Sequence, residues 1–220
     1  MKKTTIRKLI SVGIFAIAMA YLESSVVVYL RRLYGITDYA MGAPNFEPAI
    51  AAIEVGRELS TLIMLLAMGW ATGITIQSRL SYSLLGFGVW DIFYYFWLWV
   101  LIRWPSSIFE TDLLFLIPLP WWGPVIAPVL VAILMIMGGI SAIVLEDKGG
   151  NIRISVFDWA ILITGVLILL YLFMEDAISI MPADVATIAQ LNPTSFNWPI
   201  YILGLVITGY VVFHTTWHGR

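Results

Sequence analysis

The chain has 220 residues, of which 60% are hydrophobic and only 12% are charged, and its formal net charge is −2. About a quarter of the residues of a soluble domain are charged, so this composition indicates a membrane protein surrounded by the lipid bilayer. The small net charge gives no basis for a nucleic-acid partner. The absence of Cys excludes disulfides, Fe–S clusters and thiolate metal sites, and two His residues near the C-terminus argue against a haem between membrane helices.

Apolar runs of bilayer-spanning length recur along the chain, and they predict an all-α integral membrane protein with six transmembrane helices. We expect a single polytopic membrane domain over residues 1–220. The predicted spans are residues 9–30, 49–73, 80–102, 124–145, 154–174 and 199–214. The first run also fits a signal peptide, because basic residues precede it and it contains small residues that suit cleavage. We favour a retained helix, because the run continues past Glu23 to a full spanning length.

Two segments between the spans have patterns of their own. Residues 112–124 contain three Pro residues around a pair of Trp residues, which forbids a regular helix and predicts an interfacial or re-entrant segment. This segment, with Asp112 at its start, either covers the outer side of a site or anchors the chain in the headgroup layer. Residues 182–191 begin with Pro and predict a short helix on the membrane surface.

The distribution of basic residues predicts the orientation of the six spans. Eight Lys or Arg residues fall on the side of the N-terminus and three on the opposite side. Since short loops rich in Lys and Arg remain in the cytoplasm, we expect both termini to be cytoplasmic. The cell membrane is the expected location, and the longer loops then lie outside.

Charged side chains within the predicted spans mark the candidate site. Glu54, Arg57 and Glu58 lie in the first turns of the second span, where spacings of three and four residues bring them to one side of a helix. The first and third spans carry Glu23 and Asp91. A charge that faces lipid costs a few kcal/mol, so these groups must face protein or water.

The rise of an α-helix, about 1.5 Å per residue, places these groups at similar depths. With the orientation above, Glu23, Glu58 and Asp91 fall in the outer half of the membrane. Helices joined by short connections are usually neighbours, so we expect the first three spans to form one site. The predicted ligand-binding residues are Glu23, Glu54, Arg57, Glu58, Asp91, Tyr94 and Tyr95.

The charges of this cluster do not balance. Four carboxylates and one guanidinium leave an excess of negative charge, which requires protonated carboxyl groups, a bound cation, or Arg31 reaching into the cluster. A hard divalent cation such as Mg²⁺, Ca²⁺ or Mn²⁺ suits a site without His or Cys, and its predicted ligands are Glu23, Glu58 and Asp91. The same groups suit proton transfer or a polar solute that carries an amine.

Three functions remain open at this stage. The first is binding or transport of a cation or polar solute, and transport requires a polar path to the cytoplasmic face. The second is an intramembrane enzyme that uses a carboxylate-bound metal or an acid–base pair on a lipid-soluble substrate, which requires a cavity open sideways to lipid. The third is a structural subunit of a membrane complex, whose charges only pair and which needs no cavity.

The aromatic run 90–99 either lines a pocket for a hydrophobic or cationic ligand or faces lipid.

Overall fold

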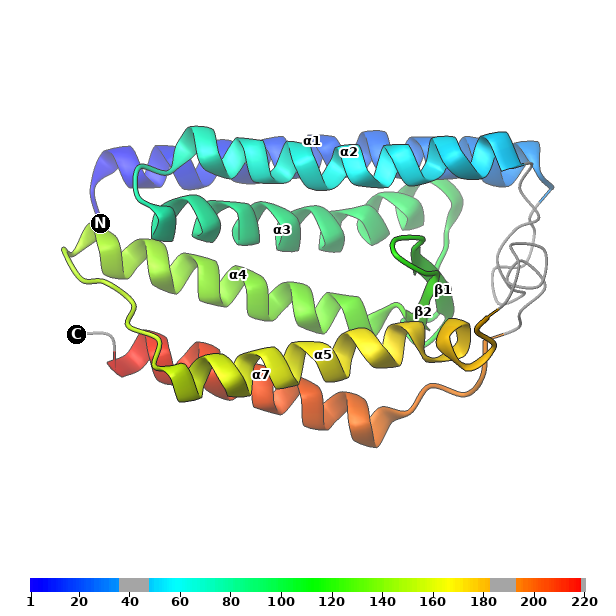
Figure 1. Cartoon of the computed structure of the whole chain (residues 1–220). Helices are drawn as coiled ribbons and strands as arrows, with labels where there is room; N and C mark the ends of the chain where they lie inside the picture. Colours follow the sequence, from blue (N-terminus) through cyan, green and yellow to red (C-terminus); the bar gives the residue numbers. More distant parts are fainter. Residues whose placement is uncertain (36–47, 183–192, 219–220) are drawn as a thin grey trace.

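The computed structural model describes residues 1–35, 48–182 and 193–218 of the chain. Within these residues it contains six helices and two strands. They are α1 (Lys3–Leu33), α2 (Pro48–Thr72), α3 (Ile76–Ile102), β1 (Thr111–Phe115), β2 (Trp121–Pro124), α4 (Ile126–Asp147), α5 (Val156–Ser179) and α7 (Trp198–His218). The helices lie roughly along one common direction, as a bundle (Figure 1).

Five of these helices, α1, α3, α4, α5 and α7, are long and apolar enough to cross a membrane. Each of the six predicted spans falls on one of the helices. The remaining one, α2, has 25 residues and carries Glu54, Arg57 and Glu58 in its first half. The surface helix predicted for residues 182–191 lies, except for its first residue, outside the described part of the chain.

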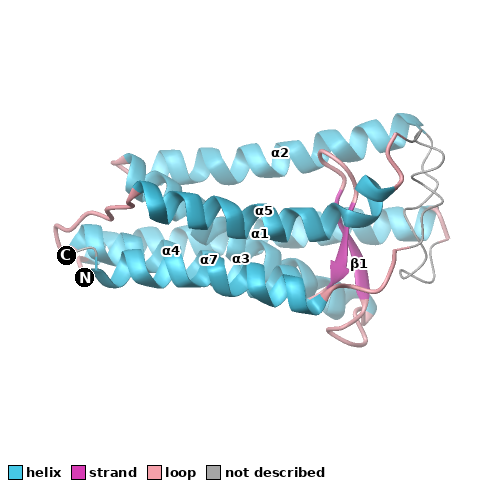
Figure 2. Ribbon diagram, turned by 60° about the horizontal axis from the view of Figure 1, so that its bottom comes forward, coloured by secondary structure: helices cyan, strands magenta, loops and turns pink. Residues whose placement is uncertain are grey.

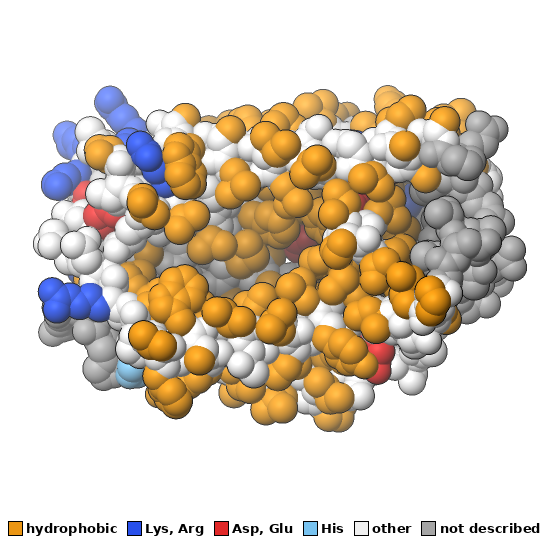
Figure 3. Space-filling model, in the orientation of Figure 1, with side chains coloured by type: hydrophobic (Ala, Val, Ile, Leu, Met, Phe, Trp, Pro, Cys, Tyr) orange, Lys and Arg blue, Asp and Glu red, His pale blue; other side chains and the backbone are white. Residues whose placement is uncertain are grey.

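Local hydrogen bonds define two of the helix starts. The side chain of Thr75 accepts a hydrogen bond from the backbone N–H of Ser78, and the side chain of Ser78 accepts one from the backbone N–H of Thr75. The two bonds form a capping box before α3. Ser155 and Asp158 form the same motif before α5. These caps lie at one end of the bundle, where α1 also begins and α7 ends (Figure 1). Basic side chains gather at this end (Figure 3, blue).

The centre of the bundle is α3, which packs against α1, α2 and α4, whereas α5 packs mainly against α7. Two glycines allow α3 and α4 to approach closely. A Cβ atom at Gly88 would lie 2.6 Å from the carbonyl oxygen of Ala132, and one at Gly139 would lie 2.7 Å from the carbonyl oxygen of Ser81. Backbone therefore meets backbone where these helices cross.

The Pro/Trp segment departs from the all-α prediction. Its strands β1 and β2 pair antiparallel and form a hairpin, which contacts α4 and α5 (Figure 2, magenta). Trp122 is buried and Trp121 half-buried within the protein, while the depth of this segment in the membrane stays a prediction. A paired hairpin satisfies many of its own backbone polar groups, which allows an irregular segment to enter an apolar bundle.

Candidate functional site

The bundle encloses a hollow of about 220 Å³. Its lining comes from α1, α2, α3, the hairpin, α4 and α5. In Figure 3 the hollow is visible on the side of the bundle between α2 and α5, with acidic side chains inside and hydrophobic side chains around its mouth. The mouth therefore lies along the flank of the helices.

All seven residues predicted to bind a ligand line this hollow. They are Glu23 from α1, Glu54, Arg57 and Glu58 from α2, and Asp91, Tyr94 and Tyr95 from α3. Spacings of three and four residues explain why each helix turns its polar residues to the same side. The structure thus brings together the charged groups of three helices, while their binding of a ligand stays a prediction.

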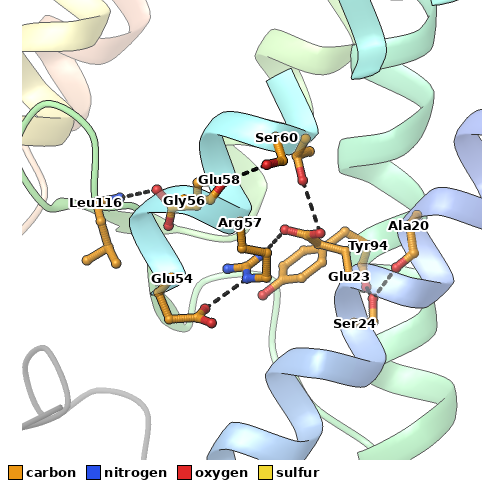
Figure 4. Close-up of polar contacts among 11 residues, drawn as sticks. Ala20, Glu23, Ser24, Glu54, Gly56, Arg57, Glu58, Ser60, Tyr94 and Leu116 are labelled. Carbon is orange, nitrogen blue, oxygen red and sulfur yellow. Dashed lines mark hydrogen bonds and ion pairs between the residues drawn. The ribbon is translucent and has the colours of Figure 1, made fainter. Parts of the chain in front are cut away.

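Arg57 joins α1 and α2 inside the hollow (Figure 4). Its guanidinium contacts the carboxylate of Glu23, and its Nε donates a hydrogen bond to Glu54 Oε2 at 2.8 Å. The hydroxyl of Thr61 donates to Glu23 Oε2 at 3.2 Å. Glu23 and Glu54 therefore share one cation, which is the internal pairing that a structural role would need.

A second ion pair lies at the hairpin end of the hollow. Arg31 Nη2 is 3.4 Å from Asp112 Oδ1, both side chains are buried, and the Arg31 guanidinium lies 4.2 Å from the ring centre of Trp104. The hydroxyl of Tyr95 also forms a hydrogen bond with Asp112. Burial raises the pKa of Asp112 to about 6, while Arg31 and the hydrogen bonds oppose that shift. Arg31 does reach the lining, but it pairs with Asp112, which lies outside the predicted cluster, so the excess negative charge of the cluster is unchanged.

Glu58 and Asp91 form no ion pair in the described part of the chain. Glu58 Oε2 accepts a hydrogen bond from the backbone N–H of Leu116 at 2.8 Å, which holds the hairpin loop against α2 (Figure 4). Asp91 is 8% exposed, and its Oδ2 has no hydrogen-bond partner among the described residues. Asp112 Oδ2 and the indole N–H groups of Trp90 and Trp121 share this lack among the described residues, but Asp91 combines it with the absence of an ion pair. A buried polar atom without a partner is costly, so Asp91 is a point of the lining where a ligand's polar group would gain a hydrogen bond.

The rest of the lining is apolar. Phe87 and Trp90 of α3 lie with ring centres 5.3 Å apart, and Phe115 of β1 lies 5.5 Å from Trp121 of β2. Trp121 in turn stacks on Phe173 of α5 at 6.0 Å, with the ring planes 3° apart. The contribution of α4 consists of Pro128, Val131, Ala132 and Met135. We call these side chains together the aromatic wall: Phe87, Trp90, Phe115, Trp121, Pro128, Val131, Ala132, Met135 and Phe173.

The metal hypothesis has no support from this geometry. Among the residues whose positions are described, no group of three or more His, Cys, Asp or Glu side chains is arranged to hold a metal ion. Of the three predicted ligands, Glu23 is paired with Arg57 and Glu58 is held by Leu116.

Part of the aromatic run 90–99 lines the hollow and part lies on the outside of the bundle. Trp90, Tyr94 and Tyr95 line the hollow, whereas Phe96 and Trp99 are exposed on the outside of the bundle. Sequence reasoning missed Phe115, Trp121 and Phe173 as parts of the site. The chain carries no local signal for them, because the folded hairpin brings them into contact with one another.

The hollow therefore combines a polar side, formed by α1, α2 and α3, with an apolar side to which the hairpin, α4 and α5 contribute most. This division is the main guide to the chemistry of its ligand. Comparisons with protein families, with curated proteins and with solved structures find no match to this chain.

Proposed function

We propose that this chain is a polytopic membrane protein that binds an amphiphilic, lipid-soluble molecule in the hollow. The polar group of the molecule would lie at the carboxylate cluster, and its apolar part along the aromatic wall. One observation carries the proposal: a lining with one polar and one apolar side, which opens on the flank of the bundle. In a membrane that flank faces acyl chains, so the ligand would enter from the lipid.

The proposal includes an arrangement in the membrane. The helix α2 crosses as a sixth span, both termini are cytoplasmic, and residues 1–220 form one domain in the cell membrane. The basic residues at one end of the bundle and the hairpin at the other support this orientation. The polar side of the hollow then lies in the outer half of the membrane.

The size of the hollow supports a ligand that is only partly enclosed. Pockets that enclose a drug-sized molecule measure about 300 to 1,000 Å³. The hollow, at about 220 Å³, is smaller, so it would hold a head group and the first few carbon atoms. The remainder of a longer chain would stay in the surrounding lipid.

Binding is favoured over transport by the position of the lining. On α1 and α2, every lining residue lies in the half of the helix nearer the hairpin. A transported solute would need polar groups that continue toward the cytoplasmic face. A purely structural subunit, in contrast, would need no hollow beside its paired charges.

An intramembrane enzyme that acts on the same amphiphile is the second candidate. The observation that favours it is the pair Glu58 and Asp91, two carboxyl groups that stand outside the ion pairs. Such groups are the usual means of acid–base catalysis. The fate of the bound molecule separates the two candidates, because a binding protein returns it unchanged and an enzyme alters it.

Photo-crosslinking tests the proposal, with a twelve-carbon alcohol that carries a diazirine in its chain and unlabelled dodecanol as competitor. We expect labelling that dodecanol displaces, at residues of the aromatic wall. Met135→Trp fills the hollow and should reduce this labelling at least tenfold. Met137→Trp is the matched control, because Met137 lies on the same helix, is 41% exposed and lies outside the lining. Equal labelling of both variants, or labelling that dodecanol does not displace, would refute the proposal.

A further inference from the structure

We propose that the polar group of the ligand is a primary ammonium, held by Asp91 and Glu58 and bordered by the rings of Trp90 and Tyr94. This inference rests on the proposed function, and it adds the chemical class of the ligand: a lipophilic amine. Four features of the lining support it.

The first feature is the charge that the lining leaves uncompensated. Five carboxyl groups and two guanidinium groups line the hollow. Arg57 contacts Glu23 and Glu54, and Arg31 contacts Asp112. The remaining carboxyl groups are those of Glu58 and Asp91. Inside an apolar bundle a cationic ligand would offset their charge, whereas an anionic head group would be repelled.

The second feature is the unsatisfied oxygen of Asp91. This side chain lines the hollow, is more than nine-tenths buried, and its Oδ2 has no hydrogen-bond partner in the described chain. An ammonium N–H in the hollow would supply that partner. The hydrogen bond would be charge-assisted and therefore stronger than one from a neutral hydroxyl.

The third feature is the set of rings beside this carboxylate. Trp90 and Tyr94 have ring centres 6.2 Å apart, and those of Tyr94 and Tyr95 are 5.0 Å apart. All three residues line the hollow, as Asp91 does. Aromatic faces attract a cation through their negative electrostatic potential, and the attraction grows when the cation is shielded from water.

The fourth feature separates a primary ammonium from other cations. The carboxylates do not form a group of three that would suit a metal ion in the described part of the structure. A quaternary ammonium has no N–H, so it would leave Asp91 Oδ2 without a hydrogen bond. A primary ammonium carries three N–H donors, which suits an acceptor on α3 and a second acceptor on α2.

Competition against the diazirine alcohol tests this inference. The competitors are dodecylamine, dodecanol, dodecyltrimethylammonium and dodecanoate, each added to the wild type, Asp91→Asn and Glu110→Gln in lipid nanodiscs. We expect dodecylamine to displace the probe from the wild type at a concentration at least tenfold below that of dodecanol, and dodecanoate to be the weakest. In Asp91→Asn the advantage of the amine should fall to about threefold or less. Glu110→Gln removes a carboxylate outside the hollow and should keep the full advantage.

The outcomes separate the amine from the site itself. If dodecylamine and dodecanol compete equally in the wild type, the amine is refuted and the amphiphile site stands. If dodecyltrimethylammonium displaces the probe at the same concentration as dodecylamine, the N–H donors are irrelevant and the primary ammonium is refuted. If no competitor displaces the probe, the proposed function itself fails. Should Asp91→Asn not fold, Glu58→Gln replaces it, and the wild-type ratio still decides.

Discussion

The backbone N–H of Leu116 donates a hydrogen bond to Glu58 Oε2 at 2.8 Å, so a charged group on α2 holds the loop of the hairpin. Two Pro residues follow in the same loop and have no backbone N–H to donate. The N–H of Leu116 is therefore one of the few groups that can fix this loop against a helix. Since Leu116, Glu58 and the neighbouring Phe115 all line the hollow, the position of the loop shapes the site.

Removal of the acceptor on α2 should loosen the hairpin. A hydrogen bond to a charged group contributes about 1.5 to 3 kcal/mol, so Glu58→Ala should accelerate amide hydrogen exchange of the loop about tenfold or more. Glu58→Gln keeps an acceptor oxygen and should stay within about threefold of the wild type. Mass spectrometry of peptides that cover residues 113–119 measures both. Wild-type exchange in Glu58→Ala would show that other contacts hold the loop.

Loss of Arg57, the cation that Glu23 and Glu54 share, should destabilise the bundle more than loss of a surface cation. Arg57→Met would leave Glu23 and Glu54 without a positive charge in a largely buried position, at a cost of about 2 to 4 kcal/mol. The control is Arg103→Met, because the Arg103 guanidinium lies 4.6 Å from the exposed ring of Trp99, a contact that contributes about 0.5 to 1 kcal/mol. Thermal unfolding in detergent should show a clearly lower midpoint for Arg57→Met.

A second substitution tests the reason for that loss. Combining Glu23→Gln with Arg57→Met removes one of the stranded carboxylates, so the double variant should recover part of the lost stability. If Arg57→Met unfolds at the same temperature as Arg103→Met, the ion pairs inside the hollow are not important to the fold.

The predictions that agree with the structure rest on the length of the apolar runs and on the positions of the charges within them. A run of about 20 apolar residues has few alternatives to a membrane helix, so the predicted spans match helices. Charges inside such runs cannot face lipid, and the helical rise gave their depth, so Glu23, Glu58 and Asp91 were expected in one layer. They do line one hollow. The exact pairing of Glu23 with Arg57 could not be read from spacing, because it depends on how α1 and α2 pack.

The hairpin and the aromatic wall could not be predicted in the same way. Strand pairing in residues 111–124 joins short apolar segments around two Pro residues, a pattern equally typical of an interfacial loop. The contact of Trp121 with Phe173 links residues far apart in the chain, and nothing in either local pattern indicates it. From the sequence, Arg31 is one of three possible ways to balance the charge of the cluster. In the folded protein it pairs with Asp112 instead.

The crossing of α3 and α4 should not tolerate a side chain at Gly88. An Ala Cβ there would lie 2.6 Å from a backbone oxygen of α4, so Gly88→Ala should force the helices apart and cost about 1 to 3 kcal/mol. Gly56→Ala is the matched control on α2, where no atom lies within 4 Å of the added Cβ and Ala favours the helix. Thermal unfolding should show a lower midpoint for Gly88→Ala and an equal or higher one for Gly56→Ala. Equal midpoints would mean that the helices can shift without loss.

Single-Cys labelling should show whether α2 crosses the membrane. The wild type has no Cys, so it serves as a blank for a membrane-impermeant maleimide. Leu33 at the end of α1 and Ile74 after α2 are both 79% exposed, so Cys should be accessible at either position. With both termini cytoplasmic, Leu33→Cys should react in intact cells, and Ile74→Cys only after the membrane is permeabilised. Reaction of both in intact cells would place the two ends of α2 on one side, and the reverse pattern would invert the bundle. Either result would remove the carboxylate cluster from the outer half of the membrane, because its depth follows from the crossing of α2 and its direction.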